Sequence, residues 1–132
     1  MYFLSKKSIS NLQEAHPDLQ RVMLKAIGYS EIDFSIQYPV RTPEEQQRML
    51  DTGASKTSNS RHLLREQDVQ VHAVDVVAGI NGDISWDIDH YRRIAKAVFR
   101  AAIEENVQVE WGGLWTNPVD GPHFQLSWKE YP

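Results

Sequence analysis

The sequence predicts an α+β domain in which helices pack around a small antiparallel sheet. Residues 17–27 carry apolar side chains at helical spacing, and residues 86–105 repeat that pattern over a longer stretch. Residues 69–78 form a strongly β-branched run, which is typical of a buried strand. With 132 residues, 41% of them hydrophobic and 24% charged, the chain suits a single domain over residues 1–132.

The first residues are expected to form a short helix and then a longer one. Ser10 and Gln13 match the capping-box pattern, which predicts a helix to about residue 15. Pro17 is suited to open the second helix and Gly28 to end it. The buried face of the second helix is one stripe spaced at i, i+3, i+4, i+7 and i+8: Leu19, Val22, Met23, Ala26 and Ile27.

A strand and a third helix are expected next. Residues 33–37 alternate apolar and polar side chains, which predicts a strand with Phe34 and Ile36 on its buried side. Thr42 is followed by proline and, three residues later, by glutamate. That pattern predicts the N-cap of a helix to about residue 50.

The second half of the chain is expected to hold most of the sheet. Residues 69–78 predict its central strand, and Asn-Gly-Asp at 81–83 predicts a turn. The longest helix is predicted from Trp86 or Asp87 to about residue 105. Its apolar positions are Tyr91, Ile94, Ala95, Val98, Ala101, Ala102 and, at its end, Ile103. Strands at 107–111 and 122–126 would flank a Gly-Gly loop.

Composition excludes several kinds of site and partner. Cysteine is absent, which excludes disulfides, thiolate zinc sites and cysteine nucleophiles, so any metal must be held by histidine and carboxylate. The net charge is −4 with dispersed basic residues, so no nucleic-acid partner is expected. No apolar run reaches the about 20 residues that span a bilayer, and residues 1–7 do not match a secretory signal. We therefore expect no membrane partner. The protein is also expected to be a monomer.

Two histidines and one aspartate are candidate metal ligands. His62 follows a polar loop, Asp75 lies in the β-branched run, and His123 begins an apolar strand. Nitrogen and oxygen donors of this kind leave the fourth position of a tetrahedral Zn²⁺ open for water. The alternatives are a solvated histidine, a structural salt bridge at Asp75 and a hydrogen-bonded core histidine at 123. Asp75 must have a cation, a hydrogen-bond donor or a metal as its partner, because an unpaired charge buried in an apolar strand is costly.

Three further polar residues bear on this candidate site. Asp120 lies three residues before His123, across a Gly-Pro turn, and is a candidate base beside the metal; its alternative role is turn formation. Arg41 follows one strand and precedes a helix, where it has either a role at the site or a glutamate partner. His72 lies on the opposite face of the strand from Asp75 by alternation, so we do not expect it to be a ligand.

Several motifs occur in one order along the chain. They are Arg41-Thr-Pro-Glu-Glu-Gln46, Ser60-x-His62, Ala73-x-Asp75, Trp111-Gly-Gly-x-Trp115 and Asp120-x-Pro-His123-Phe124. This order resembles the zinc peptidases of the D-alanyl-D-alanine carboxypeptidase and L-alanyl-D-glutamate endopeptidase family, especially phage endolysins. Residues 8–33 resemble the helical lead-in of those endolysins. The resemblance implies the D-Ala-D-Ala peptidase fold, which is Hedgehog-like, and a zinc peptidase catalytic domain.

The resemblance also implies roles for individual residues. His62, Asp75 and His123 would bind Zn²⁺, with Asp120 as the general base. Arg41 would stabilise the oxyanion. The implied substrate-binding or site-supporting residues are Gln46, Ser60 and Trp115.

The implied reaction is hydrolysis of peptidoglycan stem peptides between L-Ala and D-Glu, leading to bacterial lysis. The alternatives are a D-Ala-D-Ala carboxypeptidase and a non-catalytic wall-binding module. With no secretory signal in the sequence, the enzyme would be made in the host cytoplasm. It would reach the wall in the periplasm after release, with the help of a phage holin.

The chain departs from the family pattern between the first two ligands. His62 and Asp75 are thirteen residues apart, which is longer than the family spacing, so residues 64–69 read as a short insertion. A loop absorbs such extra length at small entropic cost, so we expect the ligands still to converge. Val71 replaces a usual glycine, and Leu114 stands where an acid is often found.

Overall fold

The computed structural model describes residues 1–51, 60–64, 70–116 and 118–132, without the side chains of residues 49 and 50. Within these residues the helices are α1 (Lys6–Leu12), α2 (Pro17–Tyr29), α3 (Pro43–Asp51) and α4 (Ile88–Glu105), with a 3-10 turn, η1 (Gly112–Leu114). The strands are β1 (Asp33–Ile36), β2 (Ala73–Ile80), β3 (Asp83–Ser85), β4 (Val109–Trp111) and β5 (His123–Leu126). The predicted α+β class is confirmed.

The strands form one antiparallel sheet in the order β1-β2-β5-β4, with β3 paired to the end of β2. The central place of β2 confirms the prediction from its β-branched composition. The strand begins at Ala73 rather than at the predicted residue 69, which lies outside the described residues. Before it, Val71 is bridged to Ala15, and the two segments exchange main-chain hydrogen bonds there.

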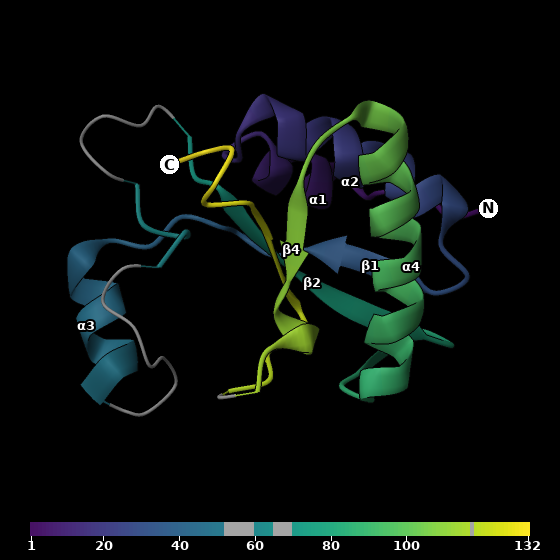
Figure 1. Cartoon of the computed structure of the whole chain (residues 1–132). Coiled ribbons are helices and arrows are strands. Elements are labelled where there is room, and N and C mark those ends of the chain that lie inside the picture. The colour runs from purple at the N-terminus through teal and green to yellow at the C-terminus, as the bar shows by residue number, and fades with distance from the viewer. Residues whose placement is uncertain (52–59, 65–69, 117) are drawn as a thin grey trace.

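The two faces of the sheet have different environments. Val74, Val76 and Phe124 join the hydrophobic core with the apolar faces of α2 and α4, which pack against each other. Because strand side chains alternate, Asp75 and His123 lie on the opposite face. Figure 1 shows α3 apart from the other helices, across the strands from α4. The polar face of β2 and β5 is therefore free to build a site.

Prediction of the first helix was wrong in its boundaries. The N-cap of α1 is Ser5, whose Oγ accepts a hydrogen bond from the main-chain N–H of Ser8. Ser10 lies inside the helix instead. With this earlier start, the buried residues of α1 are Ser8 and Leu12.

The other helix predictions hold with small changes. All five predicted stripe residues of α2 are buried, although the helix continues one residue past Gly28. The Oγ1 of Thr42 accepts from the N–H of Glu45, as the capping pattern predicted. In α4, Ala97 is buried but Ile103 is 80% exposed, so Ile103 was wrongly placed in the core. Ile103 lies outside the apolar stripe of α4 that packs against α2.

Strand β3 was not predicted. Asn81 and Gly82 both have positive φ, at 52° and 85°, and form a two-residue hairpin turn between β2 and β3. We read the Asn-Gly pair only as a turn, although it is also the strongest short-range hairpin signal. The predicted pair of strands at the C-terminal end is confirmed, since β4 pairs with β5. Within the described part of the chain, no helix combines the length and hydropathy needed to cross a bilayer.

The C-terminal tail offers a test of pH-dependent stability. The Tyr131 hydroxyl donates to Asp18 on α2, 2.6 Å away. Partial burial and this hydrogen bond raise the pKa of Tyr131 to about 12. An acid whose pKa is raised by folding stabilises the folded state below its ordinary pKa, and that contribution is lost as pH rises towards 12. We expect the Tm difference between wild type and Tyr131→Phe to shrink from pH 9 to pH 12 in thermal unfolding; a constant difference would contradict it.

Candidate metal and catalytic site

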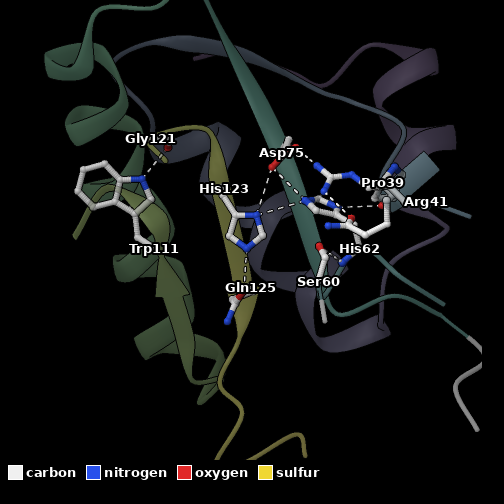
Figure 2. Close-up of polar contacts among 10 residues, drawn as sticks. Pro39, Arg41, Ser60, His62, Asp75, Trp111, Gly121, His123 and Gln125 are labelled. Atoms are coloured by element: carbon white, nitrogen blue, oxygen red, sulfur yellow. Dashed lines mark hydrogen bonds and ion pairs between the residues drawn. The ribbon is translucent and has the colours of Figure 1, made fainter. Parts of the chain in front are cut away.

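The sheet register places two of the candidate ligands side by side. Asp75 of β2 and His123 of β5 are direct cross-strand partners, so their side chains share one face. His62 reaches the same place from the segment after α3. Its carbonyl accepts from the N–H of Arg41, and its own N–H donates to the Oγ of Ser60. Residues far apart in sequence therefore meet at one point (Figure 2).

Three ligand atoms converge there. His62 Nε2 lies 3.1 Å from Asp75 Oδ1 and 3.2 Å from His123 Nδ1, and His123 Nδ1 lies 3.4 Å from Asp75 Oδ1. Donors bound at about 2.0–2.2 Å to a tetrahedral Zn²⁺ are about 3.3–3.6 Å apart. The observed separations are close to those of a zinc site. Among the described residues, these three form a group able to hold a metal ion.

The protonation of His62 supports a cation at this point. Its Nδ1 lies 2.8 Å from the carbonyl oxygen of Pro39, which can only accept, so Nδ1 carries the proton. In the neutral ring Nε2 then carries a lone pair, which faces the carboxylate of Asp75. Two acceptors in contact require a proton or a metal between them.

The electrostatics of the group agree with this. Burial opposes ionisation of Asp75, but hydrogen bonding to His123 and His62 and their charges outweigh it and hold the pKa of Asp75 well below its usual range. Burial by itself would lower the pKa of His123, but the hydrogen bond to Asp75 and its charge prevail and raise that pKa. The three side chains therefore favour positive charge at their centre.

Arg41 lies beside the candidate metal ligands. Its Nη2 is 3.7 Å from the second carboxylate oxygen of Asp75, and its Nη1 donates to Gln46 Oε1 at 3.1 Å. Gln46 is 2% exposed, whereas the Arg41 side chain is 19% exposed. The buried amide thus orients a guanidinium that still reaches solvent. The ion pair of Arg41 is with Asp75, rather than with a glutamate on α3.

Asp120 lies in the loop between η1 and β5. Its main-chain N–H donates to the carbonyl of Gly112, and its carbonyl accepts from the N–H of His123. Burial raises the pKa of the Asp120 carboxyl, although the charges of His123, His62 and Arg41 act in the opposite direction. Asp120 is outside the three-atom group but within the electrostatic range of it. A half-buried carboxyl beside the two histidines is a candidate for proton transfer.

Gly112 gives a direct test of this loop. A Cβ on Gly112 would lie 2.4 Å from the carbonyl oxygen of Asp120, closer than any real contact, so the loop must move. We expect Gly112→Ala to lower kcat for peptide hydrolysis by about a hundredfold, which is typical for a small misplacement of a reacting group. The same Cβ would lie 3.1 Å from the Cβ of His123, so zinc content measured on the same sample separates a displaced Asp120 from a displaced ligand. Wild-type kcat would show that the position of Asp120 is not critical.

Comparison with known proteins identifies the family. The sequence model of the phage L-alanyl-D-glutamate peptidases matches residues 1–126. The chain belongs to this family. The resemblance inferred from the ordered motifs is therefore confirmed.

Individual members and one solved structure agree with the assignment. The L-alanyl-D-glutamate peptidase of Listeria phage A118 is 29% identical over 133 residues, covering 98% of this chain and 44% of that protein. The chain thus spans less than half of that relative. The peptidase of Escherichia phage T5 is 29% identical over 136 residues, covering 92% of this chain and 95% of that protein. The crystal structure of Serratia marcescens L-Ala D-Glu endopeptidase ChiX has a TM-score of 0.87 and 44% identity, covering 98% and 94% of the two chains.

The departure of this chain from the family pattern does not prevent convergence. His62 and Asp75 meet despite their longer separation, as expected for a loop insertion; of that insertion, residues 65–69 lie outside the described residues, as do residues 54–59 of the preceding loop. His72 contacts Arg61 and the rings of His16 and Tyr131, away from the metal ligands, as strand alternation predicted.

Trp111 and Trp115 have different surroundings. The indole N–H of Trp111 donates to the carbonyl of Gly121, and its ring stacks on Phe124 in the core. Trp115 is 37% exposed, and its ring centroid is 5.0 Å from that of His123. Core packing therefore accounts for the first, and the second borders the ligands.

Two contacts of the ligands were missed by sequence reasoning. The carbonyl of Pro39 holds His62, and no side-chain pattern signals a main-chain partner. Gln125 Oε1 lies 2.7 Å from His123 Nε2. Gln125 is a polar residue two positions after His123 in an apolar strand, so alternation could have indicated that both share one face.

Proposed function

We propose that this chain is a zinc-dependent peptidoglycan peptidase that hydrolyses the stem peptide between L-alanine and D-glutamate. The observation that carries the proposal is the convergence of three ligand atoms, 3.1–3.4 Å apart, in a member of this family. The bond is proposed because the phage relatives and the Serratia structure bear L-alanyl-D-glutamate peptidase names.

In this proposal His62, Asp75 and His123 would hold the zinc ion. When bound, zinc supplies Lewis-acid chemistry: it polarises a carbonyl and makes water acidic enough to lose a proton near neutral pH. Asp120 accepts the proton of the attacking water and passes it to the leaving amine. Its raised pKa supports both halves of this role.

The remaining residues bind and orient the peptide. Arg41 directs its guanidinium at the oxyanion that forms as the carbonyl is attacked, and Gln46 keeps that guanidinium in place. Trp115 provides an apolar border for the peptide beside His123. Ser60 supports the segment that carries His62, which explains its burial better than a direct substrate contact does.

The proposal also includes how the protein acts. A monomeric domain over residues 1–132 would carry the whole site and act on the bacterial cell wall. Access to the wall would follow release by a phage holin. The peptidoglycan peptide is its partner.

Mass spectrometry of a digest tests the reaction. Purified disaccharide-peptide fragments are incubated with the protein, with and without a chelator, and the products are weighed. We expect loss of the stem peptide after L-Ala, and a block by the chelator that added zinc reverses. Release of only the terminal D-Ala would replace the proposal with a D-Ala-D-Ala carboxypeptidase. Zinc binding without any product would indicate a wall-binding module.

A further inference from the structure

The two ring nitrogens of His123 face different partners: Nδ1 faces the candidate metal position, and Nε2 faces Gln125. His123 Nε2 lies 2.7 Å from Gln125 Oε1, and both residues are buried, at 6% and 5% exposure. A neutral imidazole carries its proton on one nitrogen only. If Nε2 carries it, Nδ1 presents a lone pair to Asp75 and His62; if Nδ1 carries it, the ligand atom is blocked. The state of His123 therefore depends on how Gln125 is turned.

An amide by itself does not decide the question, because it can accept through oxygen or donate through nitrogen. Glu110 decides it. Gln125 Nε2 donates to Glu110 Oε1 at 2.8 Å, and a carboxylate can only accept. The NH₂ end of Gln125 is thus turned to Glu110 and its oxygen to His123. It follows that His123 Nε2 donates, so that in the neutral ring Nδ1 is the nitrogen that can bind a metal.

Sheet register holds this chain of contacts. Glu110 on β4 and Gln125 on β5 are direct cross-strand partners, and Gln125 lies two residues after His123 on the same strand. All three side chains therefore share the face of the site. Figure 2 shows Gln125 below His123, on the side of the ring away from Asp75.

The two histidines of the site reach the same state by different means. His62 is fixed by the main-chain carbonyl of Pro39, which no substitution removes. His123 is fixed by two side chains, so its orientation depends on residues that mutation can change. On the basis of the proposed metal site, we propose that Gln125 and Glu110 are positioning residues that set the His123 tautomer for metal binding.

The contacts that run from Glu110 through Gln125 to His123 are called the relay. The variants first break the relay and then restore it with the carboxylate and the amide exchanged. Gln125→Met keeps the length of the side chain but removes the acceptor. Glu110→Gln leaves an amide pair that can turn either way. The double variant Glu110→Gln, Gln125→Glu exchanges carboxylate and amide, and the new carboxylate accepts from His123 Nε2 and from the new amide. Gln108→Met, at an exposed position before β4, is the matched control.

Two measurements are made on each variant. Zinc affinity comes from competition with a chelator, and the His123 tautomer comes from long-range ¹H–¹⁵N spectra of the zinc-loaded and zinc-free protein. We expect Gln125→Met to weaken zinc binding about 10- to 100-fold, the usual cost of losing an outer partner. In its zinc-loaded spectrum the Nε2–H of His123 should lose the hydrogen-bonded shift of the wild type, because no acceptor faces it. Glu110→Gln should show a smaller loss, and the double variant should return towards wild type.

The outcomes separate this inference from the proposed function. Wild-type zinc affinity in folded Gln125→Met, or a double variant weaker than either single one, would overturn the relay while peptide hydrolysis stands. The expected affinities and tautomers in a protein that cleaves no peptide would overturn the proposed function and leave the relay intact. Thermal unfolding of each variant shows whether a loss of zinc affinity comes from a loss of folding. If Gln125→Met does not fold, the zinc affinity of Glu110→Gln and its recovery in the double variant test the relay.

Discussion

Replacing Asp120 with alanine is expected to lower kcat for stem-peptide hydrolysis by about 10²–10⁴-fold, the usual contribution of a general base. Zinc content should stay at the wild-type level, because the ligand atoms belong to His62, Asp75 and His123. The carboxyl of Asp120 lies outside that group, and burial raises its pKa. Product formation from disaccharide-peptide and elemental analysis of the purified protein measure the two effects.

The control for this variant is Asp83→Ala, which removes an exposed carboxylate from the start of β3. It should retain both zinc and turnover. Wild-type turnover in Asp120→Ala would contradict the assignment of the base. Loss of zinc together with turnover would make Asp120 a fourth ligand, a different mechanism from the one proposed.

His123→Ala is expected to lose both zinc and activity. The change leaves two donors in place of three, namely His62 Nε2 and Asp75 Oδ1, which lie 3.1 Å apart in the wild type. We expect the affinity to fall by more than the about 10- to 100-fold that loss of an outer partner costs. Added zinc should raise the Tm of wild type but not of the variant, since only binding to the folded state stabilises it. Chelator competition, Tm and product formation are measured together.

Two other histidines serve as controls for His123→Ala. His90 lies on the first turn of α4 and contacts Ser85, and His72, the residue before β2, contacts Arg61. His90→Ala should keep zinc and activity. His72→Ala should keep zinc, even if the loss of its contact with Arg61 lowers stability. Zinc loss in His72→Ala with the fold intact would contradict the strand-face assignment.

Local sequence patterns predicted most of the helices and strands, because apolar periodicity and strand composition depend on residues that are close together in the chain. The α2 stripe is buried as predicted, since its five apolar residues share one face whatever lies against them. Boundaries were less predictable. Ser5 rather than Ser10 caps α1, and Ile103 is exposed, because both depend on which neighbouring elements cover the helix.

The sequence by itself determined the family, the class of fold and the identity of the metal-ligand candidates, because ordered motifs and an isolated carboxylate in an apolar strand are visible without coordinates. Only the tertiary structure decided which nitrogen of each histidine faces the metal position. That choice depends on the carbonyl of Pro39 for His62 and on Glu110 and Gln125 for His123. These contacts come from strand register and loop packing between distant segments, and hydrogen-bond direction then follows from which groups can only accept.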